Sequence, residues 1–378
     1  MTKLVERFLK YVKFDTESSE TSGTHPSSEG QRVLAEELKK ELEAMGAKDI
    51  YLSELSYLYA TIPASPDRAS EPALGFLAHL DTSPDASGKD VKPSIITRDG
   101  EEIIVTDGTT LLGADDKLGV AIQMQLAEEL LSPDAPSHRE IRLAFTPDEE
   151  IGEGTYGFDP VRFGAKEAYT IDGGAANEVE NANFNAASAS FTIRGFSVHP
   201  GSAKGMMINA LKIAAEIVTK LPQNEAPETT EKREGFYHPT GIEGSVGKAT
   251  LSIILRDHDS KKLEARKDFL RKIAAEVNAK YGEGTAALEI KDQYRNMEEE
   301  LQKVPHLIEN ALNAVRSVGL EPTLKEIRGG TDGAHLTTEM GIPCPNLGTG
   351  GRNYHGESEY AIISEFEKAY RIVLKLAS

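Results

Sequence analysis

Three apolar segments of the chain end in histidine or acidic residues, the side chains that bind metal ions and move protons. GFLAHLD ends in His79 and Asp81, LAFTPDEE ends in Glu149 and Glu150, and AYTIDGG contains Asp172. In open α/β sheets, ligands bind just beyond the carboxyl ends of the strands. If these segments are strands of one sheet, their ends form one metal-binding crevice. The chain has a single cysteine, so cysteine-rich zinc sites are excluded and any zinc must use His, Asp and Glu.

In two of these segments, the spacing suits a metal ligand with a second acidic residue that orients the ligand or accepts a proton. His79 and Asp81 are two residues apart, which puts both side chains on one face of a strand. A carboxylate beside a ligating histidine fixes its tautomer. In PDEE we assign Glu150 to the metal and Glu149 to the base that takes a proton from an activated water. A structural histidine and an acidic surface turn are the alternatives, and neither motif excludes them alone.

Further candidates lie in turns that contain glycine. Asp115 and Asp116 in LLGADDKLG come just before a predicted helix. Adjacent carboxylates repel unless a cation lies between them or one faces solvent, so Asp115 could bridge two metal ions. The alternative is that both simply cap the helix. Near the C-terminus, RGGTDGAHLT contains His335 and NLGTGGRNYHGESEY contains His355, and either histidine could be a ligand or a surface residue.

Two further candidates lie in the sequence between Asp172 and His335. His199 precedes a Pro-Gly turn in GFSVHPGSAKG, and Arg256 ends the strand-like LSIILRDHD. A guanidinium can bind a substrate carboxylate through two hydrogen bonds. An Arg at such a place more often belongs to a surface ion pair, which is the alternative.

The order of helical and strand-like segments predicts the fold class. IYLSEL, YLYATIP, ALGFLAHL, EIRLAFT and EAYTID read as strands, residues 82–110 as a loop, and GVAIQMQLAEELL as a helix. Strands alternating with helices indicate an α/β fold with parallel neighbours. We expect a mixed, mostly parallel sheet flanked by helices.

The pattern changes near residue 183. ASFTIRGF, KATLSIILRDHD and TAALEIKDQYRNM read as strands separated by two helices, and the earlier style resumes with HLIENALNAVRSVGL. We therefore predict a smaller α+β domain at 183–296, inserted into a domain made of 1–182 and 297–378.

Composition narrows the classes of partner. With 42 Lys and Arg against 61 Asp and Glu, the net charge is −19, which should repel nucleic acid and anionic lipid. The first 14 residues, MTKLVERFLKYVKF, have the spacing of an amphipathic core helix rather than of a signal peptide. No run of 18 apolar residues predicts a membrane span. Low cysteine use suits the cytoplasm, where we expect the protein.

Taken in order, the motifs resemble those of a known family. HLDTSPDASG, LLGADDK, TPDEEIGEG, YTIDGG, SVHPG, RGGTDGAH and NYHGESEY are similar to peptidase T, the tripeptide aminopeptidases, over nearly the whole chain. NFNAAS, GFYH and RDHD make the resemblance closer than the zinc-peptidase clan that also holds carboxypeptidase G, aminoacylase and succinyl-diaminopimelate desuccinylase. The resemblance implies a catalytic domain with two zinc ions, and an inserted lid of the dimerisation type through which a homodimer forms.

The resemblance also implies the metal ligands. His79 and Asp172 would hold one zinc, and Glu150 and His355 would hold the other. Asp115 would bridge the two ions. Cobalt or manganese could substitute, because sites of histidine and carboxylate accept all three metals.

Five more roles follow from the same resemblance. Asp81 would orient His79, and Glu149 would act first as base and then as acid. His199 of the lid would stabilise the oxyanion, from its own or a partner subunit. Arg256 and Asn183 would contact the peptide.

One departure from the family concerns the stretch GKDVKPSIITRDGEEIIVTDGTTLLG. It is shorter than usual by roughly two dozen residues, and loops around a site often set specificity. The choice of tripeptides is therefore less secure than peptidase activity. A dizinc carboxypeptidase or an N-acyl-amino-acid deacylase is the alternative function, and a non-catalytic peptide-binding relative is a remote one because Glu149 is present.

Overall fold

The computed structural model describes residues 1–378, and the chain divides into two compact units. The first unit comprises Met1–Asn181, Met297–Lys325 and Thr331–Ser378, and the second comprises Ala182–Asn296 and Glu326–Gly330. The second unit thus contains the segment 183–296 that the sequence sets apart. It also contains a short later segment that carries no periodicity of its own.

The first unit is built on an eight-stranded mixed sheet with the strand order β1-β2-β6-β3-β7-β14-β8-β13. The strands are β1 (Lys48–Leu52), β2 (Leu58–Ile62), β3 (Leu74–His79), β6 (Ile141–Thr146), β7 (Ala168–Gly173), β8 (Glu178–Ala182), β13 (Thr323–Glu326) and β14 (Asn346–Gly348). The four central strands β6, β3, β7 and β14 run parallel. Strands β1, β2 and β8 pair antiparallel with their neighbours. The mixed α/β sheet expected from the sequence is therefore confirmed, with its parallel strands at the centre.

Both faces of this sheet are covered by helices. On β3, Phe76 and Ala78 point into the larger core, whereas Leu77 points into a smaller core on the other face, as the two-residue period of a strand requires. Parallel strands buried on both faces read as continuous apolar runs for this reason.

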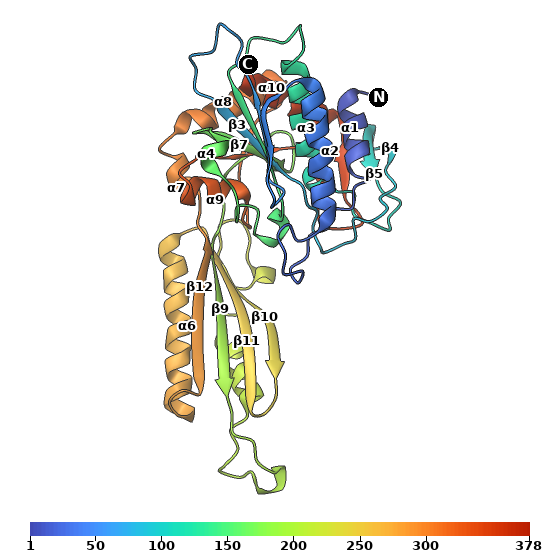
Figure 1. The fold of residues 1–378 in the computed structure, drawn as a ribbon. Helices are drawn as coiled ribbons and strands as arrows, with labels where there is room; N and C mark the ends of the chain where they lie inside the picture. The colour runs from blue at the N-terminus through green and yellow to red at the C-terminus, as the bar shows by residue number, and fades with distance from the viewer. The chain divides into compact units, whose positions relative to one another are not determined.

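The helices divide between the two faces of the sheet (Figure 1). The larger core is covered by α1 (Lys3–Tyr11), α2 (Glu29–Met45), α3 (Ala114–Leu130), α8 (Pro305–Ser317) and α10 (Ile363–Ala377). The smaller core is covered by α4 (Pro160–Phe163) and α9 (Asp332–Glu339), and α7 (Glu298–Leu301) packs near α9. Helix α3 contacts both β3 and β7, so it lies behind the strands whose ends carry the metal candidates.

Residues 82–110, expected to be a loop, contain a hairpin. Strands β4 (Ser94–Arg98) and β5 (Glu101–Val105) pair with each other, and the small sheet continues through β16 (Tyr360–Ile362) to β15 (Gly351–Arg352). Asp99 and Gly100 at the turn have φ of 53° and 85°, and an Asp-Gly pair of this kind joins two-stranded hairpins. The loop prediction was wrong because this turn signal was overlooked. The connection from β15 to β16 carries His355, so this sheet positions a metal candidate.

The second unit is a four-stranded antiparallel sheet with one covered face. Its order is β10-β11-β9-β12, formed by β9 (Asn185–Arg194), β10 (Phe236–Gly244), β11 (Lys248–Asp257) and β12 (Ala286–Tyr294). Helices α5 (Ala210–Lys220) and α6 (Ser260–Tyr281) pack on the face that carries Phe191 and Leu251. The short 3₁₀ helices of the chain are η1 (Glu149–Ile151), η2 (Pro200–Ser202) and η3 (Pro227–Thr229).

Strand β10 was missed in the sequence. It contains Pro239 and Gly241, residue types that are depleted in strands. The structure places it at the edge of the sheet, where a proline removes no hydrogen bond that an inner strand would need.

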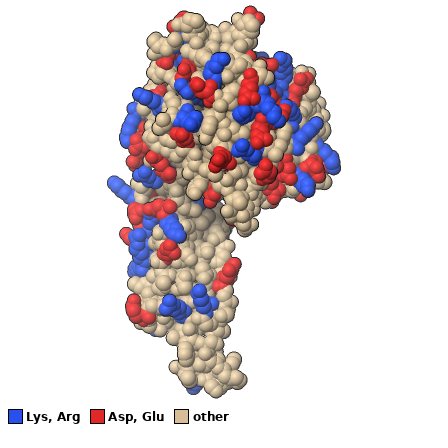
Figure 2. All heavy atoms as spheres, in the orientation of Figure 1, with Lys and Arg blue, Asp and Glu red and all other residues tan.

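Charged side chains of both signs cover the surface. Figure 2 shows lysine and arginine interspersed with aspartate and glutamate on the face that it draws. None of the helices combines the length and the apolar character needed to cross a membrane.

Candidate metal centre

The five predicted metal ligands gather at the carboxyl end of the parallel strands in the first unit. His79 is the last residue of β3, Asp172 lies near the end of β7, and Glu150 follows β6 in the 3₁₀ helix η1. Asp115 lies in the first turn of α3, where the backbone is not helical. His355 lies between β15 and β16. Each side chain therefore comes from a different strand, helix or loop, and the fold of the first unit brings these five segments together.

The distances place one carboxylate between two groups of donors. His79 Nε2 lies 2.9 Å from Asp115 Oδ1 and 3.4 Å from Asp172 Oδ1. His355 Nε2 lies 3.0 Å from Glu150 Oε2 and 3.5 Å from Asp115 Oδ2. Each oxygen of Asp115 thus faces a different histidine, which is the arrangement of a carboxylate that bridges two cations.

The donor atoms fit a divalent metal ion. One ligand atom from each of His79, Asp115 and Glu150 lies within 4.8 Å of the other two, and the same holds for His79, Glu149 and Asp172. Glu150 Oε1 is buried and has no hydrogen-bond partner, although a buried carboxylate oxygen ordinarily has a donor or a cation beside it. Imidazole and carboxylate without thiolate is a donor set that zinc, cobalt and manganese accept.

The crowded acids shift one another's protonation. Burial raises the pKa of Glu150 to about 7, with Asp115 adding to the rise and His355 opposing it. Burial also raises the pKa of Asp172 well above its usual range, and Asp115 adds repulsion. Hydrogen bonds to Asp115 and Glu150 raise the pKa of His355 to about 11. The buried acids therefore oppose one another's ionisation, and bound cations would supply the positive charge that lets them ionise together.

Asp81 touches both the histidine and the acidic turn. Its Oδ1 lies 3.3 Å from His79 Nδ1, and its carboxylate is fully buried. The same carboxylate accepts the backbone N–H groups of Glu149, at 3.0 Å, and of Glu150, at 3.1 Å. The Asp81 carboxylate thus lies beside His79 and also accepts two N–H groups of the turn that carries the two glutamates, a second contact that the sequence did not indicate.

Two buried acids that hold the centre together were given no role in the sequence analysis. Glu359 accepts the backbone N–H groups of Leu112, Gly113 and Asp115 at 2.6, 2.8 and 3.1 Å. Asp116 accepts the N–H of His79 at 3.2 Å, and also that of Gly119 at 3.1 Å. The only local signal for Glu359 is that it follows His355 by four residues. Glu357 follows the same histidine by two residues and is exposed, so closeness to His355 does not distinguish the two acids.

Replacing Glu359 by glutamine should weaken metal binding about 10–100-fold, the usual cost of losing a partner that orients a ligand. In the unchanged protein, three N–H groups of the Asp115 turn donate to the two carboxylate oxygens of Glu359. The glutamine amide offers only one acceptor oxygen for them. Titration of the metal-free protein with zinc would measure the loss. Glu357→Gln is the control, because that side chain is exposed. Equal affinities for the two variants would contradict a supporting role for Glu359.

The three remaining predicted residues belong to the second unit. His199 is exposed and begins η2, where its Nδ1 accepts the N–H of Gly201 at 3.1 Å. That bond leaves the hydrogen of the neutral ring on Nε2 as a donor. Arg256 is half-buried on β11, and its Nη1 donates to Gln293 Oε1 at 3.1 Å. Asn183 is fully buried and its amide donates to the Phe184 and Arg295 carbonyls.

The structure also settles the surroundings of the other histidine near the C-terminus. His335 lies on α9, where its Nδ1 contacts Glu339 Oε1 at 2.9 Å. Its Nδ1 thus faces the acid one turn further along its own helix.

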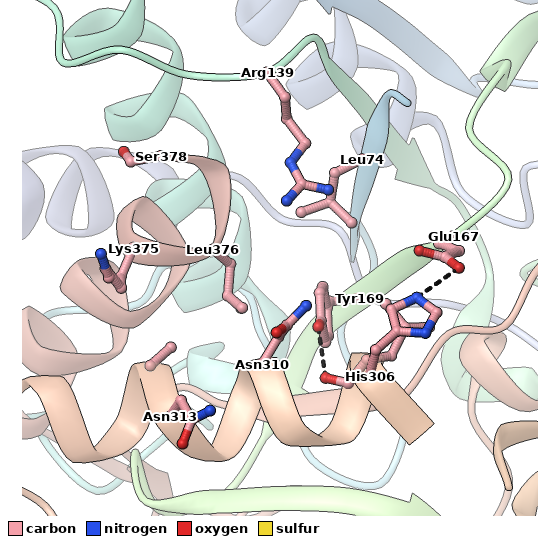
Figure 3. A pocket seen from close by; sticks show the side chains of 12 residues that line it. Leu74, Arg139, Glu167, Tyr169, His306, Asn310, Asn313, Lys375, Leu376 and Ser378 are labelled. Carbon is pink, nitrogen blue, oxygen red and sulfur yellow. Dashed lines mark hydrogen bonds and ion pairs between the residues drawn. The ribbon is translucent and has the colours of Figure 1, made fainter. Parts of the chain in front are cut away.

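A separate cavity of about 210 Å³ opens at the opposite ends of the strands. It is lined by Leu74, the first residue of β3, and by Glu167 just before β7, together with side chains of α8 and α10 (Figure 3). Figure 3 shows Arg139 pointing toward it, and the contact of 2.8 Å between Glu167 and His306. Since ligands of open α/β sheets bind at the carboxyl ends of the strands, this cavity is not the catalytic centre.

Comparisons with known proteins show which family the whole chain resembles. A family model described as a peptidase dimerisation domain matches residues 181–285. The chain is 46% identical to the Peptidase T of Clostridium novyi (strain NT), covering 100% of this chain and 98% of that protein. It is 48% identical to the Peptidase T of Parabacteroides distasonis (strain ATCC 8503), covering 99% of this chain and 98% of the relative. The crystal structure of aminopeptidase PepT from Bacillus cereus ATCC 10987 superposes with a TM-score of 0.79 at 25% identity, covering 99% and 97% of the two chains.

Proposed function

This chain belongs to the peptidase T family of the M20 peptidases, and we propose that it releases the N-terminal residue of tripeptides at a centre that holds two zinc ions. Membership makes it a metal-dependent aminopeptidase. The observation that carries the proposal is the position of the Asp115 carboxylate, with one oxygen toward His79 and the other toward His355. A single ion would not need a carboxylate shared between two histidines.

The ligand assignment follows the two groups of donors around Asp115. His79 and Asp172 would hold one ion and Glu150 and His355 the other, with Asp115, which lies between the two pairs, as the shared ligand. When bound, the metal supplies Lewis acidity, which polarises a peptide carbonyl and makes a water molecule acidic at neutral pH. Cobalt or manganese can substitute for zinc, since this donor set accepts them.

Glu149 moves the proton in the proposed mechanism. It lies within ligand distance of His79 and Asp172, and its backbone is fixed by Asp81. Its carboxylate accepts a proton from the attacking water and then donates it to the amine of the leaving peptide. His199, from this chain or a partner subunit, donates its Nε2–H to the developing oxyanion.

The two units have different roles in this proposal. The first unit is the catalytic domain, and the second unit is the lid through which two copies pair. The match of 181–285 to a dimerisation domain supports the pairing. Arg256 and Asn183 contact the peptide, and the protein acts in the cytoplasm.

Peptide length is the part of the proposal that most needs a test. The alignment with the Clostridium novyi relative spans 403 positions against 378 residues here, so at least 25 of its positions have no counterpart in this chain. Loops around a site often set specificity, so a shortened segment can change which peptides fit.

We expect the zinc-reconstituted enzyme to cleave tripeptides with a higher kcat/KM than di- or tetrapeptides of matched sequence. The measurement is amino-acid release from each peptide, with N-acetyl amino acids and N-blocked tripeptides in the same screen. Faster hydrolysis of N-acetyl amino acids would favour the deacylase that shares this metal centre. Faster cleavage of N-blocked peptides from the carboxyl end would favour a carboxypeptidase.

A further inference from the structure

Asp148 is the first acid of the PDEE motif, and the proposed metal centre gives it no role. It is fully buried, and its backbone adopts the left-handed conformation with φ of 58° immediately before η1. A non-glycine residue in that conformation is uncommon and needs surrounding contacts to hold it. The next residue along the chain is Glu149.

The Asp148 carboxylate is surrounded by donors from the segment that leads into α2. It accepts the backbone N–H of Ser27 at 2.8 Å and the Ser27 hydroxyl at 2.5 Å. Gln31 Nε2 donates at 2.7 Å, and His25 Nδ1 lies 2.9 Å away. The backbone N–H of Asp148 in turn donates to Gln31 Oε1 at 3.0 Å. Hydrogen bonds to a buried carboxylate are among the strong ones, so both the side chain and the backbone of Asp148 are fixed.

His25 extends this network to the far side of the acidic turn. Its Nε2 lies 3.1 Å from the Tyr57 hydroxyl, and that hydroxyl accepts the N–H of Gly157 at 2.9 Å. The Tyr57 hydroxyl can then donate to Nε2, which would place the hydrogen of a neutral imidazole on Nδ1, on the side of Asp148. The chain is therefore contacted before Glu149, at Asp148, and after it, at Gly157, through His25 and Tyr57, although the approach of His25 Nδ1 to Asp148 lacks the geometry of a hydrogen bond.

The acidic turn is also closed by its own backbone. The N–H of Gly152 donates to the Glu149 carbonyl at 2.7 Å, and that of Glu153 donates to the Asp148 carbonyl at 2.9 Å. Asp81 anchors the turn from β3. The Asp148 network anchors it from α2, so Glu149 stands between two buried acids that belong to different elements. Movement of either anchor would displace the Glu149 carboxylate.

We propose that Asp148 is a positioning residue for Glu149, acting through the turn that joins them and held in place by His25, Ser27 and Gln31. The inference rests on the proposed role of Glu149 as the base. Displacement of a catalytic group by about 1 Å can cost about 100-fold in rate, so an anchor that touches neither substrate nor metal still governs turnover. A purely structural acid would affect folding and leave the catalytic step alone.

A double-mutant cycle separates these two roles. Asp148→Asn should lower kcat about 10–100-fold, as loss of a supporting partner usually does, with KM changed less than about 3-fold. In the Glu149→Gln background the same change should lower the residual kcat by less than about 3-fold, because interacting residues are not additive. Equal factors in both backgrounds would overturn the proposal. Full activity of Glu149→Gln alone would instead refute the base assignment on which it rests.

Metal content and a second substitution complete the test. Asp148→Asn should retain the metal content of the unchanged enzyme, and loss of metal from it would overturn the proposal. Ser27→Ala removes one donor and keeps the carboxylate, so it should lower kcat about 3–10-fold on the scale of one hydrogen bond without changing KM. If Asp148→Asn does not fold, Ser27→Ala takes its place in the double-mutant cycle with Glu149→Gln. An unchanged kcat of Ser27→Ala would then overturn the positioning role of Asp148.

Asp159→Asn is the matched control. Asp159 begins α4 eleven residues later, and its carboxylate also accepts two backbone N–H groups, those of Val161 and Arg162, each at 3.0 Å. This variant should keep kcat within about 2-fold, since surface caps affect helix stability rather than the site. A loss equal to that of Asp148→Asn would show that any loosening of this segment slows the enzyme, and would overturn a specific role for Asp148.

Discussion

Glu149→Gln should lose about 10²–10⁴-fold in kcat, the usual contribution of a general acid–base group, while the fold and the bound metal remain. Glutamine has nearly the same shape, but its amide cannot accept and return a proton at neutral pH. The contact that fixes this turn is made by the backbone N–H, which donates to Asp81. The substitution leaves that contact in place.

The measurements are kcat on a tripeptide and the metal content by elemental analysis. Loss of one ion from Glu149→Gln would show that Glu149 is a ligand beside His79 and Asp172, a grouping that the distances also allow. Near-normal turnover would remove it from the mechanism. The control is Glu167→Gln, because Glu167 precedes β7 at the end of the strand opposite to Asp172, and its turnover should be unchanged.

The central strands and the site at their ends were predictable because both depend on local sequence. Each parallel strand is buried on both faces, so its side chains are apolar along its length. The change to a histidine or an acid marks where the strand leaves the core. His79 and Asp172 are found at such changes. Periodicity could not pair Asp115 with His355, which are brought together by the small sheet of β5 and β16.

The residues that support the site were not predictable in the same way. Glu359 and Asp148 are buried acids that accept N–H groups from segments more than 100 residues away in the sequence. Nothing in their immediate neighbours separates them from exposed acids such as Glu357. A buried carboxylate depends on tertiary partners, and a single sequence does not contain that pairing.

The short second segment of the second unit was also not predictable from the sequence. Residues 326–330 are too short to have a hydrophobic period, yet they belong to this unit. Arg328 holds them there, donating to the Lys232 and Glu234 carbonyls at 2.8 and 2.9 Å and lying over the Phe184 ring at 5.0 Å. In the sequence, an arginine next to two glycines gives no sign of these contacts. Periodicity identified the larger segment because its sheet buries one face and leaves alternate residues polar.

Asp115→Ala should lose both metal and activity, a larger effect than that of any supporting residue. Its two oxygens lie 2.9 Å from His79 Nε2 and 3.5 Å from His355 Nε2, so a bridging ligand would be removed from both ions at once. The affinity for metal should fall by more than the roughly 10–100-fold that follows loss of an outer-shell partner. Elemental analysis after dialysis and a zinc titration would measure it, with circular dichroism to confirm the fold.

Asp85→Ala is the control for this variant. Asp85 lies 3.3 Å from His355 Nδ1, and its side chain is 70% exposed. The Asp85→Ala substitution removes an acid from the Nδ1 side of His355, whereas Asp115 lies on the Nε2 side. The number of bound ions should therefore stay unchanged in this variant. Two ions retained by Asp115→Ala would refute the bridge. One ion retained would assign Asp115 to a single metal, and the carboxylate between the two histidines would then need another explanation. Loss of both ions from Asp115→Ala and from neither in Asp85→Ala is the result that the geometry of the two oxygens requires.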